Sequence, residues 1–140
     1  MKKKLFIIIS IFMLALVNSY AQTADSVSSS NQVEIYDWYT SIGMIQLRTK
    51  GSDPALVCID IAFAYKKGDK VTSNELKQRS IEIKDFLRNF FSKKTADELK
   101  DITKDDELKN ELKKEINKKI LSSGTIKDVV FLQKDIIEKY

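Results

Sequence analysis

Apolar and polar residues alternate regularly in the middle of the chain, between Ala55 and Tyr65. Every second position there holds a large aliphatic or aromatic residue: Val57, Ile59, Ile61, Phe63 and Tyr65. Because successive side chains of a strand point to opposite faces, these five share one face. The other face holds smaller residues and one acid: Leu56, Cys58, Asp60, Ala62 and Ala64. The pattern predicts a long strand whose first face carries the main core and whose second face is only partly covered.

Three further segments have the composition of strands or of strand ends. Residues 41–48 alternate around Ile45 and Leu47, and the loop signal at residues 51–54 follows them, so we expect an antiparallel hairpin with the long strand. Residues 33–39 fit a short helix or a first strand, and we assign Trp38 and Tyr39 to the core rather than to a membrane interface. The apolar run within residues 126–132 predicts a final strand.

The second half of the chain has helical spacing. Residues 72–75 fit a capping box, in which a hydroxyl and an acid satisfy the free N–H groups of a helix start. One side of that helix would carry Leu76, Ile83, Phe86, Leu87, Phe90 and Phe91. A second capping box at residues 95–98 starts a short segment. We assign the adjacent Phe90 and Phe91 to the core, with one of the two rings able to point outward towards a neighbouring subunit.

A third start signal at residues 103–106 opens the last helix. Its apolar stripe repeats every four residues: Leu108, Leu112, Ile116 and Ile120. Its polar side offers the close pairs Glu111 with Lys114 and Glu115 with Lys118. Gly124 is placed to end the helix as a left-handed cap.

These elements define the fold class. The order of hairpin, two long helices and final strand predicts an α+β domain built on a small mixed sheet of no more than about four strands. Each helix has a single apolar stripe, so we expect both helices to pack on one face of the sheet.

The N-terminus has the order of a secretory signal. Lys2–Lys4 precede the apolar run Leu5–Val17, and the small residues Ser19 and Ala21 follow at the spacing that signal peptidase recognises. We therefore read residues 1–21 as a signal peptide cleaved after Ala21, the alternative being a short retained membrane anchor. The small polar residues 22–34 are expected to form a flexible tether, and residues 35–140 a single domain.

Charge and cysteine content narrow the classes of partner. Three of the lysines behind the net charge of +4 lie in the leader, which contains no acid. The rest of the chain therefore has a net charge of only about +1. A nearly neutral domain lacks the basic face that a nucleic-acid partner requires. Cys58 is the single cysteine, which excludes an intramolecular disulfide, and its apolar neighbours predict a small buried side chain.

Candidate chemistry is sparse. The chain has no histidine, which removes the usual general base and the commonest metal ligand, and its four glycines form no phosphate loop. The acidic run Asp105–Glu107 is better explained as favourable charge at a helix N-terminus than as a cation site. The lysine pairs at residues 93–94, 113–114 and 118–119 fit a solvated helix face. We predict no catalytic residues, no cofactor and no metal.

Several stretches taken together resemble one known family. They are the strand Leu56–Phe63, the helix Arg79–Leu87, the segment Phe90–Leu99, and the later run through residues 108–117 to the strand Ile126–Phe131. The most specific part is Ser92-Lys93-Lys94-Thr95-Ala96-Asp97-Glu98-Leu99. Over residues 42–134 the chain resembles the periplasmic domain of the flagellar basal body-associated protein FliL. Gln46 departs from the asparagine that the family often shows before Leu47.

The resemblance implies a function that the residues alone do not give. It implies a stomatin-like domain that forms homo-oligomeric rings, without catalytic residues, and that contacts flagellar stator or basal-body proteins to support motility. Family members are anchored in the inner membrane, whereas this leader looks cleavable, so we expect an exported, periplasmic protein, bound to the membrane only if the leader is retained. The alternative is a soluble periplasmic scaffold or ligand-binding protein unrelated to motility.

Overall fold

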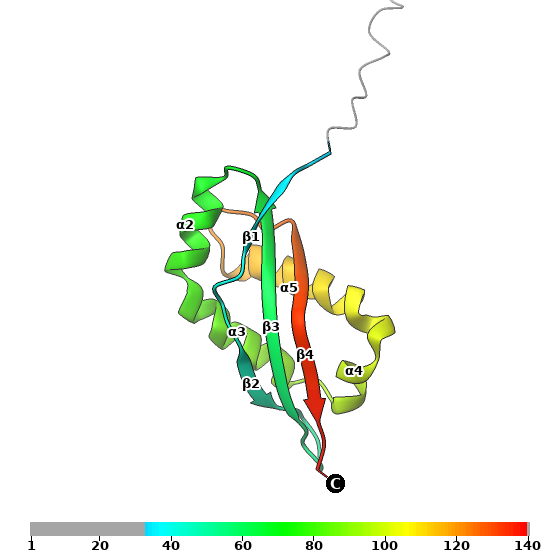
Figure 1. Cartoon of the computed structure of the whole chain (residues 1–140). Coiled ribbons are helices and arrows are strands. Elements are labelled where there is room, and N and C mark those ends of the chain that lie inside the picture. Colours follow the sequence, from blue (N-terminus) through cyan, green and yellow to red (C-terminus); the bar gives the residue numbers. More distant parts are fainter. Residues whose placement is uncertain (1–32, 140) are drawn as a thin grey trace, which may run out of the picture. The chain divides into compact units, whose positions relative to one another are not determined.

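The computed structural model describes residues 33–139, which form an α+β domain (Figure 1). In chain order the elements are β1 Tyr36–Tyr39, β2 Ile45–Arg48, β3 Leu56–Lys66, α2 Lys70–Gln78, α3 Ser80–Ser92, α4 Ala96–Lys100, the 3₁₀ turn η1 Ile102–Lys104, α5 Asp105–Lys119 and β4 Asp128–Ile137. The predicted α+β class is confirmed, but the sheet is antiparallel throughout and not mixed, because all three other strands pair antiparallel with β3. The signal peptide with Ser19 and Ala21, and all of the tether before Val33, lie outside the described residues.

The sheet is organised around β3, which pairs antiparallel with each of the other three strands. β2 pairs with the first part of β3 (Ile45 opposite Ile59) and β1 with its last part (Tyr39 opposite Phe63). β4 runs along β3 for most of its length. The predicted β2–β3 hairpin is confirmed, and residues 33–39 provide a strand rather than a helix.

A break separates β1 from β2, so the strand expected over residues 41–48 is shorter than predicted. Gly43 has a φ of 73°, a left-handed conformation that favours glycine. The turn around it buries Ile42 completely. The residues between the two strands make no strand pairing with β3, but the turn places the side chain of Ile42 in the core.

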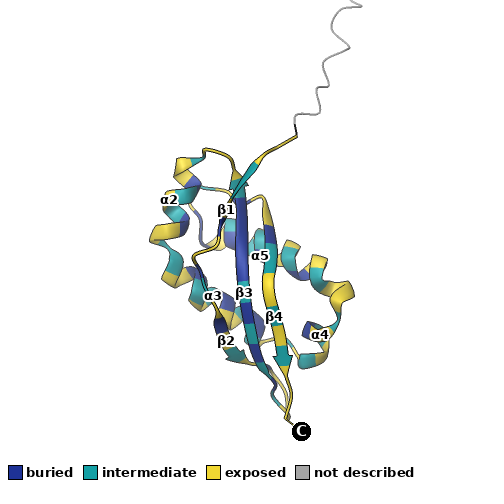
Figure 2. Cartoon of the chain, viewed as in Figure 1, coloured by how far each residue is buried: buried dark blue, intermediate teal, exposed yellow. Residues whose placement is uncertain are grey.

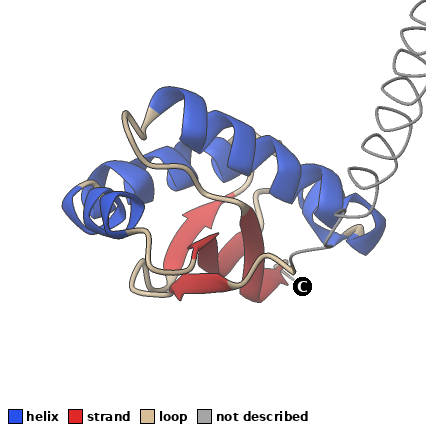
Figure 3. Cartoon of the chain, turned by 90° about the horizontal axis from the view of Figure 1, so that it is seen from above, coloured by secondary structure: helices blue, strands red, loops and turns tan. Residues whose placement is uncertain are grey.

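All helices of the described domain lie on the same side of the sheet (Figure 3). On the face of β3 that they cover, Val57, Ile59, Ile61 and Phe63 are fully buried, each contributing about 1.5–3 kcal/mol. On the opposite face Leu56, Cys58 and Asp60 are only half-buried, and exposed residues follow along β4 (Figure 2). The predicted division of β3 into a core face and a partly covered face is confirmed.

Trp38 and Cys58 lie on this second face, contrary to the expectation that both are buried. Trp38 is opposite Ala64 and is 45% exposed, whereas its neighbour Tyr39, opposite Phe63, is buried on the core face. Strand alternation cannot place both aromatic residues in the same core. Cys58 is half-buried for the same reason.

The start of α2 differs from the prediction. The helix begins at Lys70 and is capped by Asp69, whose carboxylate accepts hydrogen bonds from the backbone N–H of Thr72 (3.1 Å) and from its hydroxyl (2.7 Å). The capping box predicted for residues 72–75 is therefore wrong, because Asp69 supplies the cap three residues earlier. The helical stretch then breaks at Arg79, which separates α2 from α3.

The other two helix starts give one confirmation and one correction. Thr95 and Glu98 form the predicted capping box of α4. The start signal predicted at residues 103–106 does not provide a cap, because α5 begins at Asp105 without a side-chain cap. The hydroxyl of Thr103 donates instead to Asp101, at the start of the preceding 3₁₀ turn. The predicted apolar stripe of α5 is buried throughout: Leu108, Leu112, Ile116 and Ile120.

Gly124 has a different role from the one predicted. It is not among the glycines with positive φ, so it is no left-handed cap. A Cβ at this position would lie 2.8 Å from the Cα of Thr72, closer than such atoms approach. Glycine is required here because the loop after α5 passes directly over the backbone of α2.

β4 is longer than the predicted final strand, which was placed at residues 126–132. Its second half is polar on the surface, with Gln133 and Asp135 exposed, so it lacks the apolar run of the first half. It continues as a strand because it pairs with β3 as far as Leu56 opposite Ile137, past a bulge at Asp60 and Ile61.

Candidate functional site: an aromatic groove between two helices

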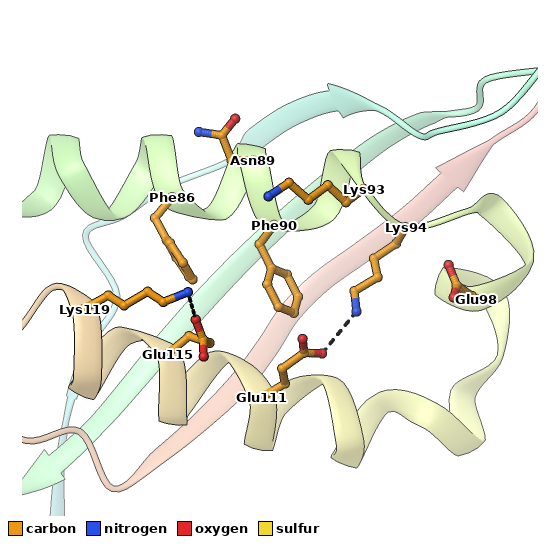
Figure 4. A pocket seen from close by; sticks show the side chains of 9 residues that line it. All are labelled: Phe86, Asn89, Phe90, Lys93, Lys94, Glu98, Glu111, Glu115 and Lys119. Carbon is orange, nitrogen blue, oxygen red and sulfur yellow. Dashed lines mark hydrogen bonds and ion pairs between the residues drawn. The ribbon is translucent and has the colours of Figure 1, made fainter.

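A groove of about 470 Å³ lies between α3 and α5. Phe86 and Phe90 project into it from α3, while Glu111, Glu115 and Lys119 line it from α5 (Figure 4). Both rings are half-buried, in contrast to the fully buried Leu87 and Phe91. The groove therefore presents apolar surface to solvent beside the core.

Helical geometry explains why the rings divide in this way. Phe86 and Phe90 are four residues apart and form one stripe, whereas the following residues, Leu87 and Phe91, are rotated by about 100° towards the sheet. Phe90 meets Phe91 edge to face with ring centroids 5.1 Å apart, and Phe91 lies 6.1 Å from Phe131 of β4. These ring contacts connect the groove to the core and hold Phe90 in a fixed orientation.

Ion pairs close one end of the groove and line its wall. The Nζ atom of Lys94 is 3.1 Å from an oxygen of Glu111 and 4.9 Å from the ring centroid of Phe90. On α5 the ammonium of Lys119 donates to Glu115, which lowers the pKa of that carboxyl below its ordinary value. These exposed pairs contribute little to stability, so their main effect is to fix the pattern of charge around the rings.

The pairs differ from those predicted on the surface of α5. Glu115 pairs with Lys119, four residues on, and Glu111 pairs across the groove with Lys94, so the predicted pairs with Lys118 and Lys114 are wrong. Of the two adjacent rings assigned to the core, Phe91 is fully buried and Phe90 is the one that points partly outward. The Lys94–Glu111 contact has no signal in the sequence, because it joins α5 to the loop between α3 and α4, 17 residues earlier.

A second polar cluster lies at the other end of α3, around the carboxylate of Glu75. It accepts three backbone N–H groups of the loop after α5, from Ser122 (2.5 Å), Ser123 (3.1 Å) and Gly124 (2.7 Å). Arg79 adds a contact at 3.3 Å. These donors hold the pKa of Glu75 at about 2, well below its ordinary value of 4.5. The cluster fastens α2 to the loop and leaves the carboxylate no free lone pair for chemistry.

The remaining acids have structural surroundings. Asp105, Asp106 and Glu107 all lie in the first turn of α5, and Asp105 pairs with Lys134 of β4. Within residues 33–139, no three His, Cys, Asp or Glu side chains gather closely enough to hold a metal ion. The same part of the chain contains no helix of the length and hydrophobicity needed to span a bilayer.

Comparison with known proteins assigns the family. The family described as flagellar basal body-associated protein FliL matches residues 42–134, about two thirds of the chain and all but the first strand and the last residues of the domain. The chain belongs to the FliL family. The predicted resemblance is confirmed.

Two relatives agree with this assignment. The flagellar protein FliL of Treponema pallidum (strain Nichols) is 34% identical over 105 residues, which are 75% of this chain and 57% of the relative. The flagellar protein FliL of Borreliella burgdorferi (strain ATCC 35210 / DSM 4680 / CIP 102532 / B31) is 30% identical over 101 residues, 72% of this chain and 54% of the relative. This FliL-family chain spans a little over half the length of both.

Proposed function

We propose that this protein is a non-enzymatic periplasmic accessory component of the flagellar motor, which supports stator function and motility through protein–protein contacts. The observation that carries the proposal is the family match over residues 42–134, which includes both helices of the groove. Association with the flagellar basal body follows from the family. The stator, the periplasm and the absence of catalysis are our extension of it.

The groove between α3 and α5 supports a function that depends on binding a partner protein. Two half-exposed aromatic rings beside fixed charges of both signs can hold an apolar side chain of a partner and orient its polar neighbours. The chain has no histidine, and the acids nearest the rings are engaged by lysines. This arrangement favours binding over proton transfer.

The N-terminal pattern supports export. A basic start, a thirteen-residue apolar run and small residues at 19 and 21 favour passage into the envelope, where basal-body proteins are found. N-terminal sequencing of the protein isolated from cells tests this part of the proposal: Gln22 as the first residue indicates cleavage after Ala21, whereas an intact Met1 indicates a retained leader.

A deletion strain tests the motor role. We expect its cells to swim more slowly than the parent, and the deficit to widen in viscous medium, where the motor works against a higher load. Complementation with the wild-type chain should restore swimming. A chain in which both Phe86 and Phe90 are replaced by Ala should restore it poorly at equal protein level.

The matched control is Ile81→Ala, which removes an aliphatic side chain that is 82% exposed elsewhere on α3. We expect this variant to complement fully. Normal swimming of the deletion strain at every viscosity would instead favour the alternative of a periplasmic scaffold unrelated to motility. Equal complementation by the groove variant and the control would remove the groove from the proposal.

A further inference from the structure

The face of the sheet opposite the helices is uncovered in the described domain (Figure 1, Figure 3), and it includes several exposed apolar side chains. Trp38 and Leu132 are 45% and 53% exposed, and Met44, which directly precedes β2, is 42% exposed. Val130 lies opposite Ala62 on the same face. Together these residues flank β3 from Asp60 to Ala64, and we call this surface the open face.

Asp60 lies at the centre of the open face. It is opposite Gln133 of β4, between Cys58 and Ala62 on its own strand. Its Oδ1 atom is buried and has no hydrogen-bond partner among the described residues. A buried, unpaired carboxylate oxygen costs roughly 1–3 kcal/mol, so the free domain maintains this acid at the expense of stability.

The charges around Asp60 do not compensate it. The polar neighbours on β4 are Gln133 and a second acid, Asp135, opposite Cys58. The basic residues of this face are Arg48, opposite Leu56, and Lys66 at the end of β3, which the rise per residue places roughly 13 Å and 20 Å along the strand from Asp60. The middle of the open face therefore combines apolar side chains with a local negative charge and has no cation beside Asp60.

We propose that the open face binds an amphipathic helix of a partner protein whose apolar stripe contains one Lys or Arg, and that this cation pairs with Asp60. A helix packed on the open face would complete a helix–sheet–helix arrangement. A purely apolar occupant would leave Asp60 desolvated without a donor, and an acidic one would add repulsion. A cationic group satisfies the orphan oxygen while aliphatic neighbours cover Trp38 and Leu132.

The proposal rests on the proposed function only in assuming that the domain acts by protein contact, and it is tested without cells. The probes are synthetic helical peptides of about 20 residues, long enough to cover β3, with a leucine stripe and either Lys, Leu or Glu at its centre. Trp38 is the single tryptophan of the chain, so peptides without tryptophan can be titrated by its fluorescence. The full chain is used.

We expect the Lys-centred peptide to bind and to change the Trp38 spectrum, with the Glu-centred peptide roughly 10- to 100-fold weaker. Asp60→Asn should remove most of this difference. Asp97→Asn, which makes the same change of charge in α4, should preserve it. Leu132→Gln should weaken binding of the Lys-centred peptide, whereas Ile102→Gln, at a more exposed aliphatic residue outside the face, should not.

The unfolding temperature of the free variant distinguishes binding from a structural role. Because Oδ1 of Asp60 makes no hydrogen bond within the domain, Asp60→Asn should leave that temperature unchanged or raise it while weakening binding. The proposal is overturned if this variant unfolds several degrees earlier, or if Lys- and Glu-centred peptides bind equally. Sedimentation showing that the chain self-associates through Asp60 would also overturn it, since the occupant would then be a second copy. A failed motility test would leave these results standing.

Discussion

Replacing Glu75 by Gln tests whether one carboxylate fastens the loop after α5 to α2. Gln keeps the size of the side chain but removes its charge and one acceptor oxygen, and it turns an amide NH₂ group towards backbone N–H donors. The carboxylate accepts three such donors and Arg79, and only 12% of the side chain is exposed, so water can replace few of the lost contacts.

The pKa gives the magnitude. Lowering the pKa of Glu75 from 4.5 to about 2 corresponds to about 3 kcal/mol of stability at neutral pH, because a tenfold change in proton affinity is worth about 1.4 kcal/mol. We take about 2–3 kcal/mol as the expected loss, which in a domain of this size lowers the unfolding temperature by roughly 10 °C or more.

The sign of the pH dependence follows from the direction of the shift. A carboxyl whose folded pKa is depressed contributes its full stability above the unfolded pKa of 4.5, and the contribution is lost as the pH falls towards 2. Urea denaturation of wild type and Glu75→Gln should therefore show the full difference at pH 7 and less than half of it at about pH 3.

Glu82→Gln is the matched control, because Glu82 also contacts Arg79 but is 53% exposed on its side chain. We expect it to change the free energy of unfolding by less than about 0.5 kcal/mol. A Glu75→Gln variant as stable as this control at pH 7, or a difference that does not narrow in acid, would show that the loop is held by other contacts.

Three further substitutions have defined outcomes. Gly124→Ala should lower the unfolding temperature strongly, because the new Cβ meets the backbone of Thr72 at 2.8 Å, whereas Ser123→Ala should have little effect in the same melt. Phe91→Ala should cost about 3–5 kcal/mol in urea denaturation, since it removes a fully buried ring in contact with Phe90. Thr95→Ala should cost about 1 kcal/mol by the same measurement, because it removes the hydroxyl of the α4 capping box.

The features that could be predicted from the sequence are those in which neighbouring positions carry the information. The alternation from Val57 to Phe63 identified β3 and its core face, and the four-residue spacing from Leu108 to Ile116 identified α5 and its buried stripe. The capping box at Thr95 was recognisable because its two partners are three residues apart. In each case the local pattern and the tertiary packing require the same structure.

The features that were missed depend on residues far apart in the chain. Gly124 was predicted to be a helix cap. The backbone that leaves no room for a side chain there belongs to Thr72, which is 52 positions earlier in the chain. Glu75 was assigned to a capping box, although its carboxylate binds a loop nearly fifty residues later. The groove was not anticipated, because Lys94 of the loop after α3 meets Glu111 of α5 only in the folded domain.

The pairing of β4 with β3 has a consequence for the growing chain. Nine residues of the central strand have partners in β4, which is synthesised after every other element of the described domain. Until they arrive, one long edge of an apolar strand remains unpaired and able to join a strand of another molecule. A chain cut short before Asp128 would therefore retain both long helices and most of its apolar residues, yet be prone to aggregate. The sheet of this domain is therefore completed only by the last of its described strands.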